Sequence, residues 1–184
     1  MGVDSVFWVP PTWPITVPHG GPRELARYVQ EGLPEVRDIV HRAQGALQRS
    51  TGDPALFAYA SGDPAARAFA EIRAIFEQLQ SMKPIVGGQF AYVLEPSESA
   101  PGRGQRIRLA REVLHWGQGT CIDWVLLFAA CLLQAHVNPV VVLTMTHAVA
   151  GYWTNEPRND RRSTILTHSV TISRGRVSAR FSGR

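Results

Sequence analysis

Residues 121–133 form the longest apolar stretch of the chain, and Asp123 is the only ionised side chain within it. A helix that is apolar on every side must be enclosed by the rest of its fold, because no face of it suits water. The stretch is too short to cross a bilayer, which takes about 20 apolar residues. We therefore expect a central helix around which the other elements pack.

A Gly-x-Cys motif, Gly119 to Cys121, opens this helix and places a thiol on its first turn. Unpaired backbone N–H groups and the positive end of the helix dipole favour a thiolate there, the form that attacks a carbonyl carbon. The other interpretation is a buried structural cysteine. Cys131 lies further along the same helix, roughly 15 Å away, which is too far for a disulfide. Two reduced thiols are typical of a cytoplasmic protein.

The chain has 184 residues, of which 45% are hydrophobic, and this is enough to build the core of one domain. Residues 1–20 are rich in proline and contain Trp8 and Trp13, which predicts an extended arm that lies on the body through its aromatic rings. We expect residues 21–184 to form a single domain. Nothing in residues 1–18 resembles an export signal, and no membrane association is expected.

Helical spacing and chain breakers predict three helices in residues 21–82. The first covers residues 22–32, the second opens at Pro34, and the third opens at Pro64 with Asp63 as its N-cap. Apolar residues at helical spacing predict the buried faces, which are Val36, Ile39, Val40, Ala43 and Leu47 in the second helix and Phe69, Ile72, Phe76 and Leu79 in the third.

The remaining elements are predicted to form a core over residues 85–175. We expect a short strand at 90–94, a helix at 109–115, a β-branched strand at 140–143 and a further strand at 147–153, followed by one or two closing strands. Helices that precede a small antiparallel sheet indicate an α+β fold.

Positive charge is concentrated at the C-terminal end, because residues 158–184 contain seven arginines and a single acidic residue, Asp160. Such an end can bind nucleic acid or an acidic partner, and a merely solvated tail has the same composition.

Several motifs occur in an order that is similar to a known family. They are Gly104-Gln105-Arg106-Ile107-Arg108, Gly119-Thr120-Cys121-Ile122-Asp123, Leu127-Phe128-Ala129-Ala130, and the segment from His147-Ala148 to Trp153. Together they resemble the transglutaminase-like branch of the papain-like cysteine peptidases, in the form found in bacterial conflict (defence) proteins, over roughly residues 56–153. The resemblance implies a papain-like fold, with a central Cys-bearing helix packed on a small antiparallel sheet.

The resemblance also implies a cysteine-dependent acyl-transfer enzyme that acts on a peptide or protein through a thioester and uses no cofactor. Cys121 is the expected nucleophile and His147 the expected base. Gln105, or else Gln118, is expected to donate to the oxyanion beside the Cys121 backbone amide. Peptidase-like or amidase-like hydrolysis and transglutaminase-like transfer to an amine differ only in the nucleophile that resolves the thioester.

The group that orients His147 stays open. A hairpin after residue 153 would place residues 167–169 antiparallel to His147, where related proteins have Asp, Glu or Asn. The alternatives are Asp160, Glu156, His168 or no residue at all. The missing acid supports a second hypothesis, in which a catalytically impaired domain of this fold binds a protein or a nucleic acid.

The other residues that could take part in catalysis or metal binding have structural interpretations. In the first helical turn, Asp123 is expected to complement the helix dipole. Trp116 and Trp153 are expected either to wall a cleft or to fill the core. The remaining histidines are not spaced with the cysteines as a closed zinc site requires, so no metal is expected.

Overall fold

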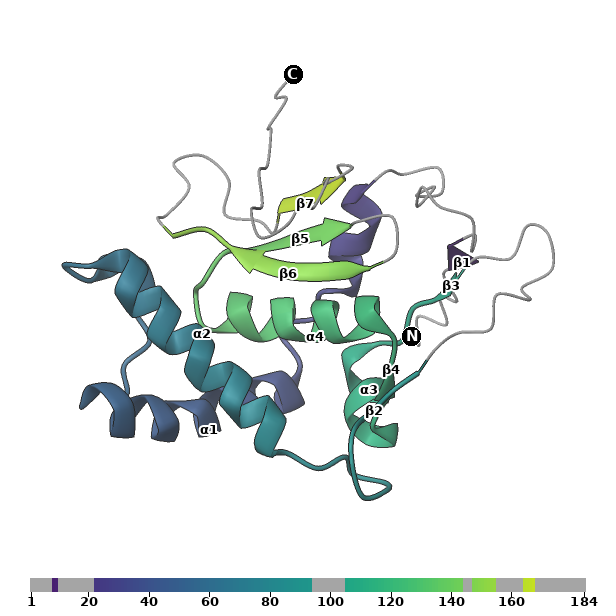
Figure 1. Ribbon diagram of the computed structural model, residues 1–184, viewed down its shortest axis with the longest axis horizontal. Helices are drawn as coiled ribbons and strands as arrows, with labels where there is room; N and C mark the ends of the chain where they lie inside the picture. Colours follow the sequence, from purple (N-terminus) through teal and green to yellow (C-terminus); the bar gives the residue numbers. More distant parts are fainter. Residues whose placement is uncertain (1–7, 10–21, 94–104, 144–146, 155–163, 168–184) are drawn as a thin grey trace, which may run out of the picture.

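The computed structural model describes residues 8–9, 22–93, 105–143, 147–154 and 164–167, and it has an α+β fold (Figure 1). Its helices are η1 (Pro22–Tyr28), α1 (Pro34–Thr51), η2 (Ala58–Ala60), α2 (Pro64–Ser81), α3 (Ala110–Trp116) and α4 (Cys121–Gln134), of which η1 and η2 are 3₁₀ helices. Its strands are β1 (Trp8–Val9), β2 (Ala91–Tyr92), β3 (Gln105–Arg106), β4 (Gln118–Gly119), β5 (Pro139–Leu143), β6 (Ala148–Tyr152) and β7 (Thr164–Thr167). The α+β class expected from the sequence is confirmed.

Helix α4 lies between the sheet of β5 and β6 on one side and helices α1 and α2 on the other, and it also contacts α3 (Figure 1). Its buried residues are Ile122, Asp123, Val125, Leu126, Leu127, Ala129, Ala130, Cys131 and Leu132. Apolar area removed from water stabilises a fold by roughly 25 cal/mol per Å², so an element buried on all sides anchors the core. The enclosed central helix predicted from the apolar stretch is confirmed.

The chain reverses direction directly after α4. His136 has a φ of 61°, and the Val137 N–H donates to the Leu132 carbonyl at 2.9 Å. Strand β5 then returns along α4, and β6 pairs antiparallel with β5, from Leu143 opposite Ala148 to Pro139 opposite Tyr152. The start of β6 therefore lies at the same end of the helix–sheet layer as the start of α4 (Figure 1).

The third strand of this sheet differs from the sequence prediction. The strand order is β6-β5-β7, and β7 pairs parallel with β5, with Thr167 opposite Leu143. The predicted hairpin, which placed residues 167–169 antiparallel to His147, is wrong. Strand β6 lies between β5 and β7 in the chain and runs antiparallel to β5, so the parallel pair needs no crossover connection of its own.

Helices α1 and α2 begin as predicted. Pro34 occupies the first turn of α1, and all five residues expected on its buried face are buried. The Asp63 side chain accepts a hydrogen bond from the Ala66 N–H at 3.0 Å and so caps α2. The predicted buried stripe of α2 is wrong for Phe69 and Phe76, which are 56% and 50% exposed, whereas Ile72 and Leu79 are partly buried and pack against the core. The residues that α2 buries are Ala68, Glu71, Ala74 and Ile75.

Two pairs of short strands complete the described fold. β1 pairs antiparallel with β3, which joins Trp8 and Val9 of the N-terminal arm to Gln105 and Arg106. β2 pairs parallel with β4. The rest of the predicted arm and all seven arginines of the C-terminal end lie outside the described residues. Within the described part of the chain, no helix combines the length and the apolar character that a bilayer-spanning segment needs.

Candidate functional site

Strand β4 fixes where α4 begins, together with Gly117, which precedes the strand, and Gly119, which is its last residue. The Gly117 carbonyl accepts a hydrogen bond from the Ala91 N–H at 2.7 Å. The Gly119 carbonyl accepts one from the Val93 N–H at 3.0 Å. Gly117 has a φ of 67°, and a Cβ at this position would meet Pro84 Cγ at 2.6 Å. Only glycine suits this turn, because it tolerates positive φ and has no side chain to collide with the proline.

Asp123 holds the first turn of α4 to the preceding chain. Its side chain is 1% exposed and accepts hydrogen bonds from the Thr120 N–H at 2.8 Å and the Thr120 hydroxyl at 3.1 Å. It also accepts from the Arg108 N–H at 2.8 Å and from the Arg108 guanidinium at 3.1 Å. These contacts agree with the expectation that Asp123 serves the helix start, and they occupy both of its carboxylate oxygens.

Cys121 is the first residue of α4, and its side chain is partly buried. The hydroxyl of Tyr92, the last residue of β2, interacts with the side chain and the backbone of Cys121. Burial and, after it, the hydrogen bond with the Cys121 side chain raise the pKa of Tyr92 above its ordinary value. Tyr92 is thus a side chain in contact with the predicted nucleophile that the sequence analysis did not identify.

The second thiol has a very different environment. Cys131 is 0% exposed, and burial raises the pKa of its thiol to about 12. A thiol that is neither accessible nor readily ionised does not act as a nucleophile. Of the two cysteines, only Cys121 has a side chain that reaches the surface.

His147 precedes β6 by one residue, and its side chain is exposed. Helix α4 spans roughly 21 Å and β5 roughly 17 Å, so a chain that travels down α4 and back along β5 ends close to the level at which it began. Because β6 starts where β5 ends, His147 and Cys121 lie at the same end of the helix–sheet layer. The topology of three consecutive elements therefore brings the two predicted catalytic residues to one side of the molecule.

The other predicted site residues are placed less completely. Gln105 pairs with Val9 through the backbone of β3, and its side chain lies outside what the structure describes. Gln118 is exposed on β4. The three candidates for the group that orients His147, which are Glu156, Asp160 and His168, lie outside the described residues.

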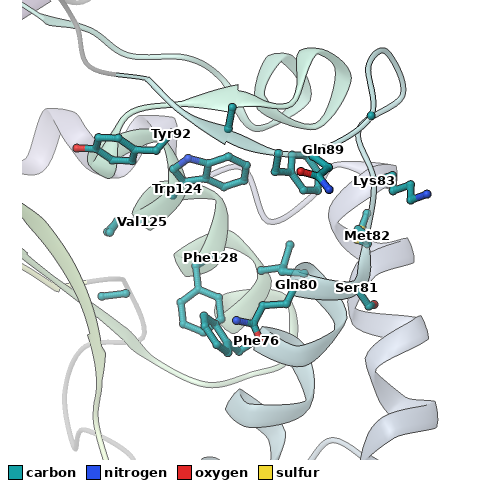
Figure 2. Close-up of a pocket in the computed structure, with 15 residues that line it drawn as sticks. Phe76, Gln80, Ser81, Met82, Lys83, Gln89, Tyr92, Trp124, Val125 and Phe128 are labelled. Atoms are coloured by element: carbon teal, nitrogen blue, oxygen red, sulfur yellow. The ribbon is translucent and has the colours of Figure 1, made fainter.

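An apolar cleft of about 770 Å³ lies beside α4 (Figure 2). Trp124, Val125 and Phe128 of α4 line one wall, and further side chains come from the end of α2, from residues 82–92 and from β6. The residues that line it are Phe76, Leu79, Gln80, Ser81, Met82, Lys83, Gly88, Gln89, Phe90, Ala91, Tyr92, Trp124, Val125, Phe128 and Ala150.

The cleft explains several residues whose roles the sequence left open. Trp116 and Trp153, which were expected either to wall a cleft or to fill the core, do not line it, and Trp116 is exposed, whereas Trp124 does line it. The Trp124 indole N–H donates to the Gly119 carbonyl at 3.0 Å, and a Cβ on Gly119 would lie 3.1 Å from that nitrogen. Phe76, expected in the core, lines the cleft instead.

The described residues contain no group of three or more His, Cys, Asp or Glu side chains that is arranged to hold a metal ion. No protein-family model, curated protein or solved structure matches this chain.

Proposed function

We propose that this protein is a cysteine-dependent acyl-transfer enzyme of the transglutaminase-like, papain-like kind, with Cys121 as its nucleophile and His147 as its general base. The observation that carries the proposal is topological. Helix α4 and strand β6 begin at the same end of one layer, where Cys121 is the first residue of α4 and His147 directly precedes β6. The side chain of Cys121 is partly buried and that of His147 is exposed, so a substrate can approach both from the surface.

The proposed reaction begins when the imidazole of His147 takes the thiol proton of Cys121. The sulfur then attacks the carbonyl carbon of an amide or ester in a peptide or protein substrate, and a tetrahedral oxyanion forms. The carbon–nitrogen or carbon–oxygen bond breaks, and His147 returns its proton to the leaving amine or alcohol. The acyl group remains on Cys121 as a thioester.

The thioester is resolved by a second nucleophile. Water or an amine attacks the thioester carbon, His147 takes the proton that this nucleophile loses, and the Cys121 sulfur leaves and is reprotonated. Hydrolysis and transfer to an amine use the same protein groups, Cys121 and His147, in this scheme. They therefore differ only in what reaches the thioester.

Backbone N–H groups at the start of α4 are suited to receive the developing oxyanion. The first N–H groups of any helix have no partner within it, and they point towards the position that the carbonyl oxygen occupies when sulfur attacks from the first turn. Tyr92 lies at the same point, where its oxygen accepts from the Cys121 backbone N–H and its hydroxyl proton is directed at the Cys121 side chain. Gln105 remains the candidate for an additional donor on the basis of its motif alone.

The experiment that tests this proposal follows the hydrolysis of p-nitrophenyl acetate by the full chain and by three variants. We expect Cys121→Ala to abolish turnover. His147→Ala should lower it by about 100-fold or more, the size of a general acid–base contribution. Cys131→Ala, a change of the buried thiol, is the matched control and should retain activity. Equal turnover in the wild type and the Cys121 variant would refute the proposed enzyme and favour the second hypothesis, a domain that binds a partner.

A further inference from the structure

The cleft beside α4 has walls built largely of aromatic rings. Phe76 of α2 meets Phe128 of α4 edge to face at 6.2 Å between ring centroids, and Phe90 meets Trp124 in the same manner at 5.2 Å. Edge-to-face pairs leave ring faces and edges on which a further aromatic group can pack. Among the residues that line the cleft, Lys83 alone carries a charge, and its amine points away from the rings (Figure 2).

The cleft lies next to the proposed nucleophile, although Cys121 is not itself among the residues that line it. Trp124 and Val125 follow Cys121 by one helical turn, so they lie on the same face of α4 as the thiol. Tyr92 connects the two regions directly, because its ring lines the cleft while its hydroxyl interacts with Cys121. Tyr92 and the first turn of α4 are therefore the two features that relate the cleft to Cys121.

We propose that this cleft binds a large apolar side chain of the acyl substrate, aromatic by preference, next to the carbonyl group that Cys121 attacks. The inference rests on the proposed function and adds the substrate class to it. The volume of about 770 Å³ falls within the range of small-molecule sites, roughly 300–1,000 Å³, and leaves room for the backbone next to the bound side chain. Gln80, Ser81, Lys83 and Gln89 also line the cleft, but a charged or small polar side chain that packed against the aromatic rings would lose its hydration there without gaining a hydrogen bond from them.

The test compares how fast Cys121 reacts with two alkylating reagents that share one reactive group. N-benzyl iodoacetamide carries an aromatic ring, and iodoacetamide does not. Each rate is divided by the rate of the same reagent with free cysteine, and the Cys131→Ala background leaves a single thiol. We expect the folded protein to favour the benzyl reagent by about tenfold or more, the gain from burying an aromatic ring.

Helix α2 offers a matched pair of variants. Phe76 and Phe69 are both about half exposed, but only Phe76 lines the cleft. Phe76→Ser should reduce the preference for the benzyl reagent several-fold, whereas Phe69→Ser should leave it unchanged. As a second measurement on the unaltered protein, N-acetylphenylalanine amide should slow the benzyl reagent more than it slows iodoacetamide.

A preference that is absent, or that both variants reduce equally, overturns the inference. Alkylation needs only an accessible thiol, so this result is independent of thioester chemistry. A lost preference with intact turnover of p-nitrophenyl acetate refutes the cleft as a substrate site and leaves the proposed function standing. A retained preference without Cys121-dependent turnover supports the cleft and refutes the proposed function.

Discussion

At the scale of single residues, the two cysteines differ more than their shared helix suggests. Cys121 lies on the first turn of α4 with a partly buried side chain, whereas Cys131 is 0% exposed. Burial raises the pKa of Cys131 to about 12, so at neutral pH its thiol is both inaccessible and fully protonated.

We expect iodoacetamide to alkylate Cys121 faster than Cys131 by about a hundredfold or more in the folded protein, since Cys131 is inaccessible and burial raises the pKa of its thiol. Peptide mapping by mass spectrometry at timed intervals gives the two rates. In denaturant the rates should become equal, which provides the control. Comparable rates in the folded state would contradict the environments described for the two thiols.

Tyr92 gives a second prediction at this scale. A hydroxyl that donates to sulfur stabilises the thiolate, and a typical hydrogen bond contributes about 0.5–1.5 kcal/mol. Tyr92→Phe keeps the aromatic ring in the cleft and removes only the hydroxyl. The alkylation rate of Cys121 at neutral pH should therefore fall by roughly two- to tenfold.

The control for this prediction is a rate comparison in denaturant, where the hydroxyl no longer contacts Cys121 and the variant should match the wild type. A rate that is unchanged or higher at neutral pH would show that the hydroxyl merely covers the sulfur. Circular dichroism confirms that the variant is folded.

At the scale of elements, α2 shows why hydrophobicity alone misassigned a buried face. Its residues at helical spacing form two apolar faces, and the one with larger side chains was taken for the core. The face that α2 buries consists of Ala68, Glu71, Ala74 and Ile75, and the charge of Glu71 concealed it in the sequence. Arg67 pairs with Glu71 at 3.0 Å and so makes the burial of the carboxylate possible.

Glu71 should make the stability of the fold depend on pH. Burial, opposed by hydrogen bonds from the Phe57 N–H and Arg67, raises the pKa of Glu71 above its ordinary value of 4.5. The folded state then binds more protons than the unfolded state between those two values. The stability linked to this group is fully present below the unfolded pKa and is lost as pH rises through the folded pKa.

The test is urea denaturation of Glu71→Gln and the wild type between about pH 4 and 8. Because glutamine does not titrate, the variant should gain stability relative to the wild type as pH rises through this window. Glu77→Gln is the matched control, since Glu77 pairs with Arg73 in the same i,i+4 geometry on the same helix but is 48% exposed. Parallel pH profiles for the wild type and Glu71→Gln would refute the burial effect.

The sheet shows a different limit of prediction from sequence. The β-branched run at 140–143 and the strand that begins near His147 were predicted correctly, because each carries its own pattern. The pairing of β7 was not, because the polar segment before it does not reveal whether the chain turns back beside β6 or crosses to β5. The two-residue strands β2 and β4 are too short to carry any periodicity, and so the position of Tyr92 beside Cys121 could not be foreseen.

At the scale of the whole molecule, the sequence predicted the parts of the site that depend on chain order. One apolar helix had to be central, the strand after it had to return along it, and the next strand had to begin near its start. These relations place Cys121 and His147 at one end of the layer. The cleft could not be predicted, because it forms where the ends of α2 and β2 meet a face of α4.

The account as a whole depends on a thioester at Cys121 that forms with the help of His147. The most direct measurement is intact-protein mass spectrometry after brief mixing with p-nitrophenyl acetate, followed by peptide mapping. We predict one acetyl group per chain, located on Cys121, released by hydroxylamine and formed far more slowly in His147→Ala. Acetylation of Cys121 at the same rate in the wild type and the His147 variant would contradict the account, because the thiol would then be reactive without a catalytic partner.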